Sequence, residues 1–282
     1  MPITIYSATG CVRCRVVREF LNEHGLPFQD YDALSEGKEE FRSFYQENRQ
    51  YIYRGSEGVE FPIYYDGEVF RQGLPAVAAL LIGGPALEGF FKPGTLHGQW
   101  LDGIYISDGP PAYGEILLKV LAYLKKQNFK IQIDTNGLNA DLLASILERR
   151  LADRVVMEVK GPLKLYDLIL NQPVDAVEIE KSIALVSKCS EYTFFTTIAP
   201  VVRQDRDPAQ ISYITPEEVT QAARLIKKAG GDNQQPYGLR IFDPESAHGQ
   251  EERTLEPLSQ NALFKYRSAA RKYQFKTEIL KD

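Results

Sequence analysis

Cys11 and Cys14 are the two residues of this chain whose type and spacing best suit chemistry. They follow an apolar run typical of a strand, which contains Ile3 and Ile5, and they begin a run with the apolar spacing of a helix. Two thiols on the first turn of a helix can close a small disulfide ring without unfolding the chain. The pattern therefore predicts a dithiol that interchanges between thiolate and disulfide forms.

Cys11 is predicted to be the nucleophile of this pair and Cys14 the resolving thiol. Cys11 would lie at the helix N-terminus, where unpaired backbone N–H groups and the positive end of the helix dipole favour a thiolate. Arg13 adds a positive charge between the two cysteines. Such surroundings lower a cysteine pKa from about 8.5 to roughly 3.5–7.5, so much of Cys11 should be ionised at neutral pH.

The same spacing also occurs in half of a four-cysteine zinc site. The chain has three cysteines, so it cannot complete such a site alone, and no metal ligands are predicted within one chain. A metal ion or a [2Fe–2S] cluster bridged between the cysteines of two subunits remains an alternative, as does an inert pair. Redox use is the favoured interpretation.

Length and composition narrow the class of protein. A chain of 282 residues with 44% hydrophobic residues is long enough for two domains, each with its own core. The net charge of −5 and the lack of a basic run interleaved with aromatic residues argue against nucleic-acid binding. The longest apolar run, 76–82, is too short to span a bilayer. A cytoplasmic protein is expected. Because that compartment is reducing, a dithiol there is expected to be oxidised and reduced in a catalytic cycle rather than to form a structural disulfide. The sequence sets no oligomeric state.

The first 82 residues have the pattern of one compact α/β unit. Asp66 and Gly67 form the turn pair of a tight hairpin, and Pro75 stands in the first turn of a helix, where its missing N–H does no harm. The expected elements are strands at 3–6 and 28–31, helices at 11–23 and 37–48, a hairpin at 62–71 and a last helix that opens at 74–75.

This order of elements, with Cys-x-x-Cys after the first strand and Pro62 leading the hairpin, resembles a glutaredoxin over residues 2–82. The resemblance implies a thioredoxin-like fold, a cis peptide bond before a Pro62 that faces the dithiol, and a Gly73 that lies beside the bound thiol peptide. It places Arg13, Phe61, Pro62 and Gly73 in the thiol-substrate site. Glutathione or another thiol would serve as the reductant, and no tightly bound cofactor is implied.

Three features depart from the glutaredoxin pattern. Val12 and Arg13 replace the commoner Pro-Tyr pair, Phe61 precedes the proline where valine or threonine is usual, and residues 49–60 look like an insertion. These departures favour no particular thiol partner. The alternative interpretation of Pro62 is a proline on an edge strand.

Residues 83–103 are predicted to be a linker, because six glycines and two prolines should interrupt regular structure there. Residues 104–282 then alternate strands and helices, which predicts a parallel sheet covered by helices, either open or curled into an incomplete (β/α) barrel. The expected strands are 104–107, 130–135, 154–160, 191–198, 238–242 and 277–280, and the expected helices are 113–127, 139–149, 175–188, 215–229 and 259–273.

Short polar runs end several of these strands, where α/β barrels keep their active sites. The runs are ISDGPP at 106–111, DTNG at 134–137, MEVK at 157–160, FTT at 195–197 and YGLRIF at 237–242. In order and spacing they resemble the radical S-adenosylmethionine activating proteins of anaerobic ribonucleotide reductase over residues 104–243. The resemblance implies a ligand pocket, for which the candidate residues are Ser107, Gly109, Asp134, Asn136, Glu158, Lys160 and Thr197, with Thr196 and Arg240 beside them.

The cysteine loop that this radical chemistry needs is missing from the chain. Three cysteines from one loop hold the [4Fe–4S] cluster of such enzymes, whereas Cys189 is the single cysteine outside the redox pair. Cys189 is predicted to be a buried thiol on a helix. Pro110 replaces the glutamate of the family's Ser-Gly-Gly-Glu-Pro run. We therefore expect no [4Fe–4S] cluster and a catalytically degenerate second domain.

The sequence thus predicts a thiol–disulfide oxidoreductase whose second domain recognises a protein partner. The resemblance implies a partner from the anaerobic ribonucleotide reductase system. The alternative is a non-enzymatic protein that binds a nucleotide or S-adenosylmethionine and whose dithiol senses redox state. In the simplest interpretation of the second domain, the polar runs only end strands and cap helices.

Overall fold

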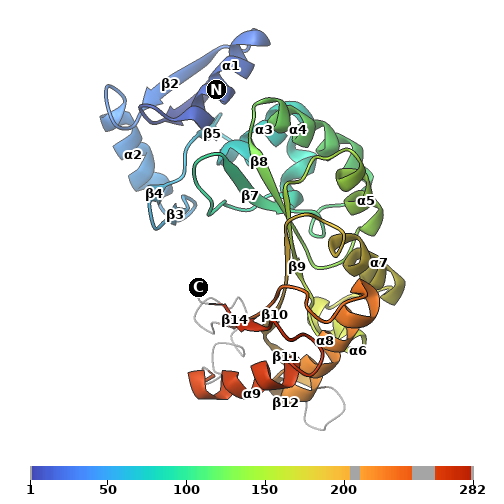
Figure 1. Ribbon diagram of the computed structural model, residues 1–282. Helices are drawn as coiled ribbons and strands as arrows, with labels where there is room; N and C mark the ends of the chain where they lie inside the picture. Colours follow the sequence, from blue (N-terminus) through green and yellow to red (C-terminus); the bar gives the residue numbers. More distant parts are fainter. Residues whose placement is uncertain (1, 204–209, 243–257, 281–282) are drawn as a thin grey trace. The chain divides into compact units, whose positions relative to one another are not determined.

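The computed structural model describes residues 2–203, 210–242 and 258–280 (Figure 1). The chain divides into two compact units, one of residues 1–133 with 149–153 and the other of residues 134–148 with 154–282. The division falls within a single strand, β8 (Lys130–Thr135). It therefore lies at a different place from the predicted domain boundaries at residues 82 and 104.

A mixed four-stranded sheet lies at the start of the first unit, in the blue part of Figure 1. Its strands are β1 (Ile3–Ser7), β2 (Phe28–Asp32), β5 (Ile63–Tyr65) and β6 (Phe70–Gln72). Their order is β2-β1-β5-β6, with β1 parallel to β2 and antiparallel to β5, and with β6 antiparallel to β5. The helices of this part are α1 (Val12–Glu23), α2 (Lys38–Asn48) and α3 (Leu74–Gly83). The predicted thioredoxin-like fold is confirmed.

Helix α1 begins and ends where the sequence predicts. Cys11 is its N-cap residue, and Gly25 follows its last turn with a φ of +63°, a conformation that favours glycine. The residues that the helix buries recur at helical spacing, namely Cys14, Val16, Val17, Phe20 and Leu21. The strand-turn-helix order therefore places Cys11 directly after β1 and at the N-terminus of α1.

The core beneath this sheet is largely aromatic. Tyr6 of β1 stacks on Phe44 of α2 with ring centroids 4.3 Å apart, and both rings are buried together with Ile52 and Ile63. Phe61 packs against the same cluster. Aromatic rings bury a large apolar area each, so packing in this cluster holds Phe61 in place. Strand β5 begins two residues later, at Ile63, and its start is therefore held as well.

Two stretches of the first unit hold more regular structure than the sequence predicts. The stretch that resembles an insertion contains a hairpin of β3 (Arg54–Gly55) and β4 (Gly58–Val59). The predicted linker contains a 3-10 helix at Pro85–Phe90 and the start of β7 (Trp100–Tyr105), whereas residues 92–99 between them form no helix or strand, so regular structure is interrupted over part of this stretch only. The 3-10 helix buries Phe90 completely, and the free energy gained by this burial offsets the conformational entropy that the glycines lose when they become ordered. Helix α4 (Gly114–Lys126) and β8 follow.

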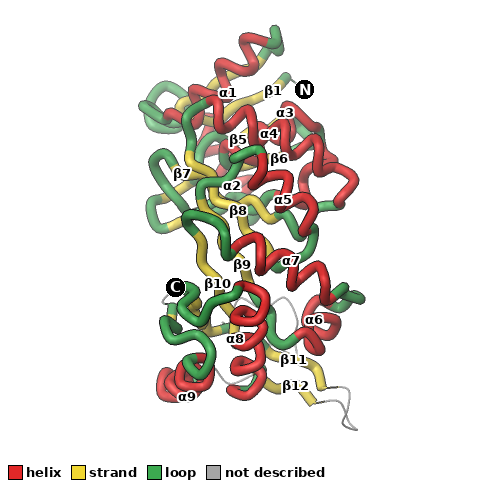
Figure 2. The backbone as a smooth tube through the Cα atoms, turned by 45° about the vertical axis from the view of Figure 1, so that its right-hand side comes forward, coloured by secondary structure: helices red, strands yellow, loops and turns green. Residues whose placement is uncertain are grey.

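The strands of the second unit pair in parallel, and β9 and β10 are seen among the yellow segments of Figure 2. They are β9 (Arg154–Glu158), β10 (Tyr192–Ile198), β13 (Tyr237–Ile241) and β14 (Glu278–Ile279). With β7 and β8 they complete a six-stranded sheet of order β14-β13-β10-β9-β8-β7. This order places β14 and β7 at the two ends of the sheet, and Phe91 forms an isolated antiparallel bridge to Ile104 of β7. The predicted α/β class is confirmed.

Within residues 134–203, 210–242 and 258–280, five helices and one hairpin accompany these strands. The helices are α5 (Ala140–Glu148), α6 (Leu163–Leu170), α7 (Ala176–Val186), α8 (Pro216–Gly230) and α9 (Gln260–Ala270). The hairpin pairs β11 (Pro200–Arg203) with β12 (Gln210–Tyr213). Side-chain caps fix the starts of three predicted helices, because Asp175, Thr215 and Ser259 accept hydrogen bonds from the first turns of α7, α8 and α9. Helix α6 and the hairpin were not predicted, since such short elements show few periods of an apolar pattern.

Candidate dithiol site

The two cysteines of the CxxC sequence form a disulfide at the N-terminus of α1. Their Cα atoms lie 5.3 Å apart, and Cys11 Sγ accepts a hydrogen bond from the backbone N–H of Cys14 at 3.1 Å. Cys14 is fully buried, whereas Cys11 is half-buried. After reduction, Cys11 is thus the sulfur that a partner can reach, and the helix N-terminus favours its thiolate.

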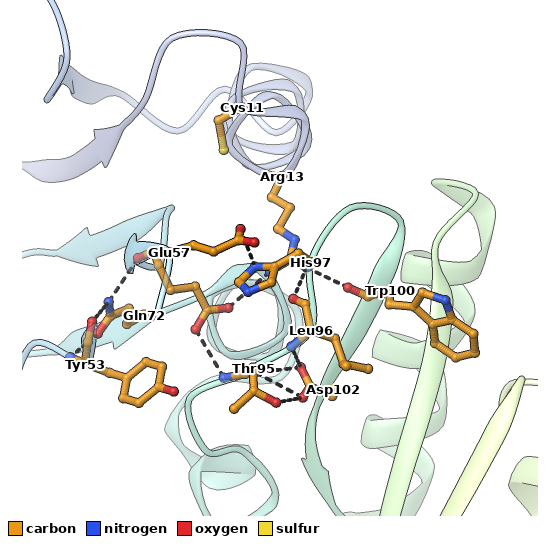
Figure 3. A network of polar contacts seen from close by, with 12 residues as sticks. Cys11, Arg13, Tyr53, Glu57, Gln72, Thr95, Leu96, His97, Trp100 and Asp102 are labelled. Atoms are coloured by element: carbon orange, nitrogen blue, oxygen red, sulfur yellow. Dashed lines mark hydrogen bonds and ion pairs between the residues drawn. The ribbon is translucent and has the colours of Figure 1, made fainter. Parts of the chain in front are cut away.

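Arg13 does not direct its charge to the sulfur of Cys11. Its guanidinium group contacts Glu60 Oε1 at 3.3 Å and donates hydrogen bonds to the carbonyl oxygens of Leu96 at 2.8 Å and Trp100 at 2.6 Å. Figure 3 shows the Arg13 side chain extending from α1 toward Leu96 and Trp100. Only 13% of the side chain is exposed. The charge of Arg13 is thus paired with Glu60, whereas the sequence suggests that it acts on Cys11.

Glu60 is a buried carboxylate beside this arginine. Its side chain is 11% exposed, and Oε2 accepts a hydrogen bond from the backbone N–H of Gly94 at 3.1 Å. Burial raises the pKa of Glu60 to about 7, an effect that Arg13 and the Gly94 N–H oppose and that the negative charge of Asp102 reinforces. Near neutral pH, Glu60 is therefore present in both charged and neutral forms.

Residues 94–102, here called the 94–102 segment, are held by charged side chains. Asp102 of β7 accepts hydrogen bonds from the backbone N–H groups of Thr95 at 3.0 Å and Leu96 at 3.1 Å, and from Thr95 Oγ1 at 2.8 Å. Arg13 and Glu60 bind the same segment, and Figure 3 shows Arg13 reaching Leu96 and Trp100 from α1. Several backbone N–H and C=O groups of this segment are thus bound by acidic and basic side chains, which form stronger hydrogen bonds when they are charged.

A pocket of about 640 Å³ opens beside Cys11. It lies wholly within the first unit. Its walls come from the first turn of α1, the β3–β4 hairpin and the 94–102 segment, and the lining includes Cys11, Arg13, Tyr53, Glu57, Glu60, Phe61, Leu96, His97 and Phe129. His97 Nδ1 lies 3.2 Å from Glu57 Oε2 at the exposed rim. The pocket is large enough to receive a peptide side chain next to the reacting sulfur.

The remaining residues predicted for the thiol-substrate site lie close to this pocket. The peptide bond between Phe61 and Pro62 is cis, as the glutaredoxin resemblance implies. Gly73 donates a backbone hydrogen bond to the carbonyl oxygen of Pro62 at 2.9 Å and has a φ of +84°. A Cβ atom on Gly73 would lie 2.5 Å from Glu60 Oε1, so a side chain there would require the carboxylate to shift, and the positive φ would strain it as well. Their role in substrate binding stays a prediction.

The polar residues predicted for a ligand pocket do not all fall in one unit. Ser107 and Gly109 belong to the first unit, whereas Asp134 and Asn136 belong to the second. Within the second unit, Asn136 Oδ1 accepts a hydrogen bond from the backbone N–H of Leu138 at 3.1 Å, in a local turn. A pocket that unites the four residues stays a prediction.

The other candidates of the second unit lie at neighbouring strand ends. Lys160 Nζ lies 2.5 Å from Glu158 Oε2 just beyond β9, and strand pairing places Thr197 of β10 opposite Arg240 of β13. Thr196 Oγ1 donates to the carbonyl oxygen of Val159 at 2.6 Å. These two contacts join the side chains to one another and to the backbone, as the ends of strands require.

The third cysteine corrects one detail of the sequence interpretation. Cys189 is half-buried and lies beyond the end of α7, so it is neither fully buried nor helical. Its Sγ contacts the carbonyl oxygen of Leu185 at 3.7 Å, and burial raises its thiol pKa. Cys189 is therefore expected to be less reactive than a thiol at a helix N-terminus.

Comparison with known proteins finds relatives for the N-terminal domain and for the region that follows it. Residues 3–70 match the Glutaredoxin family. Over 178 residues the chain is 25% identical to a candidate glycyl-radical enzyme activating enzyme of Methanocaldococcus jannaschii, a match that covers 61% of this chain and 68% of the relative. The recognition of a glutaredoxin domain joined to a region similar to an activating enzyme is thereby confirmed.

A solved structure was also found, a domain of pyruvate-formate lyase-activating enzyme from Bacteroides vulgatus. It is 14% identical, with a TM-score of 0.44, and the match covers 64% of this chain and all of that domain.

The cluster of the activating enzymes does not fit the cysteines of this chain. Two of the three cysteines form the disulfide of the glutaredoxin domain, and Cys189 follows α7. A [4Fe–4S] cluster of that kind needs three thiolates from one loop. In the three described stretches, no group of three or more His, Cys, Asp or Glu side chains is placed to hold a metal ion. Nor does any helix there have the length and apolar character needed to cross a membrane.

Sequence reasoning missed four polar residues of the glutaredoxin domain and the segment that follows it. These are Glu57, Glu60, His97 and Asp102. One signal could have pointed to Glu60, because it directly precedes the Phe61-Pro62 pair that the resemblance singles out. Asp102 and His97 carried no signal, since they lie in the stretch interpreted as a linker.

Proposed function

We propose that this chain is a thiol–disulfide oxidoreductase in which Cys11 is the nucleophile and Cys14 the resolving thiol. The observation that carries the proposal is the Cys11–Cys14 disulfide at the N-terminus of α1. The match of residues 3–70 to the Glutaredoxin family supports it. The difference in burial supports these two roles, because an accessible sulfur can attack a partner and a buried sulfur can close the ring.

The reaction proceeds through a mixed disulfide. The Cys11 thiolate attacks one sulfur of a partner disulfide, a bond forms between them, and the second partner sulfur leaves as a thiolate. Cys14 then loses its proton to solvent and attacks Cys11 Sγ, which closes the Cys11–Cys14 disulfide and releases the first partner sulfur. The partner gains two electrons and the dithiol loses two. Glutathione or another thiol reductant returns the pair to its reduced state.

We propose further that the second unit recognises the protein partner and performs no radical chemistry. Similarity to a candidate glycyl-radical enzyme activating enzyme supports a partner from a glycyl-radical system, for which anaerobic ribonucleotide reductase is the specific case. The cysteine count supports the absence of a cluster. After anaerobic reconstitution with iron and sulfide, the purified chain should form no 5′-deoxyadenosine from S-adenosylmethionine. Formation of that product above background would overturn this part of the proposal.

A second candidate function is a binding protein whose dithiol only senses redox state. The polar strand ends around Glu158, Lys160 and Thr197 favour it, because such groups could bind a nucleotide or S-adenosylmethionine. Calorimetric titration with these ligands distinguishes the two functions. Micromolar binding together with no disulfide exchange would favour the binding protein.

Single-turnover exchange tests the main proposal. Reduced chain is mixed with 2-hydroxyethyl disulfide, and the products are identified by mass spectrometry after acid quenching. The wild type should end as the Cys11–Cys14 disulfide, whereas Cys14→Ser should stop at a mixed disulfide on Cys11. Cys189→Ser serves as the matched control and should behave as the wild type does. A mixed disulfide on Cys14 or Cys189 would contradict the assignment.

A further inference from the structure

The pocket beside Cys11 has an exposed rim and a recessed sulfur. Ser56 and Glu57, at the turn of the β3–β4 hairpin, line the pocket and are exposed, and the same is true of His97 in the 94–102 segment. Cys11 lines the same pocket but is half-buried. A substrate that enters the pocket therefore passes the hairpin and the segment before it reaches the sulfur.

The β3–β4 hairpin is tied to the glutaredoxin domain at both of its ends. Gln72 of β6 is buried, and its Oε1 accepts a hydrogen bond from the backbone N–H of Tyr53 at 2.8 Å (Figure 3). Its Nε2 donates to the carbonyl oxygens of Tyr53 at 2.9 Å and Glu60 at 3.0 Å. The hairpin lies between these two residues, so one buried amide anchors both of its strands. The hairpin is thus a fixed wall of the pocket.

The 94–102 segment forms a second wall and meets the hairpin at the rim. In addition to its contacts with Arg13 and Asp102, the segment is held at Gln99, whose carbonyl oxygen accepts a hydrogen bond from the backbone N–H of Lys130 at 2.8 Å. The contact of His97 with Glu57 joins the two walls (Figure 3). Both of these side chains are more than half exposed, so the contact adds little stability. It nevertheless narrows the entrance to the pocket.

We propose that these two walls restrict the dithiol to narrow substrates. Disulfides in small molecules and in extended chain segments reach Cys11, whereas a disulfide on the surface of a folded domain does not. The inference rests on the proposed oxidoreductase function and specifies its substrate. The volume of about 640 Å³ is that of a site for a small molecule. A folded protein instead docks through a broad patch of about 800 Å², which meets the rim before a sulfur at its surface reaches Cys11.

A protein partner would then present its disulfide near a chain end or in a long exposed loop. Between the walls, Tyr53, Phe61 and Leu96 are half-buried and offer apolar contacts to the residues beside the reacting sulfur. The charged groups of the lining are paired with one another, Arg13 with Glu60 and Glu57 with His97, so acids and bases offset each other. Selection in this pocket therefore depends on the shape of the substrate rather than on its charge.

Two forms of one carrier domain test the proposal. The first holds a disulfide between neighbouring strands on its folded surface, and the second holds a Cys-Gly-Gly-Cys disulfide in a flexible Gly/Ser tail. Rate constants for single-turnover oxidation of the reduced full chain by each form are measured by acid quenching and mass spectrometry. Dithiothreitol also reduces both forms, and its ratio of rate constants gives the intrinsic difference between the two disulfides. The ratio for the chain divided by the ratio for dithiothreitol is the steric preference.

The steric preference of the wild type for the tail disulfide should be at least about tenfold. A trimmed variant, in which Gly-Gly replaces residues 54–59, removes one wall, and two glycines span the gap because Arg54 and Val59 are paired. Its preference should be at least about threefold lower than that of the wild type. The double variant Glu57→Ala with His97→Ala opens the rim alone and should lower the preference about twofold. Glu39→Ala, an exposed change on α2 outside the pocket, is the matched control and should keep the wild-type preference.

Two results would overturn the inference and leave the oxidoreductase function intact. One is a wild type that reacts with both forms in the same ratio as dithiothreitol does. The other is a steric preference that the trimmed variant retains in full. If the trimmed variant does not fold, the double variant decides, because both of its positions are exposed, and an unchanged preference there would overturn the inference. Failure of the wild type to react with 2-hydroxyethyl disulfide would instead refute the proposed function.

Discussion

The dithiol pocket and the polar strand ends of the second unit use charged side chains in different ways. Around the dithiol, Arg13, Glu60 and Asp102 all bind the backbone of the 94–102 segment, and this segment lines a pocket next to an accessible sulfur. At the strand ends, Lys160 pairs with its near neighbour Glu158. The first arrangement builds a wall around a reactive atom, whereas the second satisfies polar groups at the place where strands stop.

This difference shows that the same types of side chain do not always form a functional site. Both regions contain the acids, bases and hydroxyl groups from which enzymes build active sites. Of the two regions, the dithiol pocket contains a pair of groups that can be oxidised and reduced reversibly, Cys11 and Cys14. This difference supports the proposal that the first region carries the chemistry and that the second unit serves recognition.

The largest expected effect comes from comparing substitutions in the two regions. Cys11→Ser should lower the rate of disulfide exchange by at least about 1000-fold, because a hydroxyl group does not form a disulfide. The double variant Glu158→Gln with Lys160→Met removes an ion pair of the second unit and should leave that rate within about twofold of wild type. Stopped-flow exchange with 2-hydroxyethyl disulfide measures both. A large loss of rate in the double variant would show that the two regions act together.

The next effect concerns the stability of the dithiol region. Arg13→Ala removes the partner of a buried carboxylate and the donor to two carbonyl oxygens, so it should lower the free energy of unfolding by about 3 kcal/mol. Arg15→Ala on the same helix is the matched control, because Arg15 is exposed and pairs only with exposed Glu19. That control should cost less than about 1 kcal/mol. Urea unfolding followed by circular dichroism measures both. Equal small losses would show that the 94–102 segment is held by other contacts.

A third effect is a dependence of stability on pH that comes from Glu60. Its folded pKa of about 7 exceeds its usual value of 4.5, so the folded state binds the proton more tightly than the unfolded state. Its contribution is present below pH 4.5 and is lost as the pH rises through about 7. The loss amounts to up to about 3 kcal/mol at 1.36 kcal/mol per pKa unit.

Urea unfolding at pH 5 and pH 8 measures this contribution. Glu60→Gln should be less sensitive to pH than the wild type over that interval, whereas Glu57→Gln, at an exposed position, should match the wild type. If the wild type and Glu60→Gln lose equal stability between the two pH values, Glu60 does not titrate in this range.

The smallest effect distinguishes two roles of Arg13. Because its guanidinium group is paired with Glu60, Arg13→Ala should raise the Cys11 pKa by less than about half a unit. The pH dependence of iodoacetamide alkylation in a Cys14→Ser background measures it, at low and at high salt. An increase of a full unit that salt reduces would restore the original interpretation, in which Arg13 mainly stabilises the thiolate.

Local patterns were enough to predict most of the fold. Helix α1 carried a complete set of signals, from the N-cap cysteine to the glycine after its last turn. The caps at Asp175, Thr215 and Ser259 did the same for three helices of the second unit. The 3-10 helix at Pro85–Phe90 was missed because its stability comes from burial of side chains such as Phe90, which local composition does not reveal.

The dithiol itself was predictable, but its surroundings were not. Spacing alone brings Cys11 and Cys14 together, since both lie in one helical turn. Arg13, Glu60 and Trp100 meet across long stretches of sequence, and such long-range contacts depend on how the elements pack. The charge of Arg13 was therefore assigned to the nearest sulfur in sequence, although its actual partners lie far along the chain.

The order in which the three cysteines react tests the central claim most directly. The fully reduced chain is treated at pH 7 with less than one equivalent of iodoacetamide, and the alkylated peptides are quantified by mass spectrometry. Cys11 should take up the label at least about tenfold faster than the other two, because it is accessible at a helix N-terminus, Cys14 is fully buried, and burial raises the pKa of Cys189. Equal or faster labelling of Cys14 or Cys189 would contradict the assignment of Cys11 as the nucleophile.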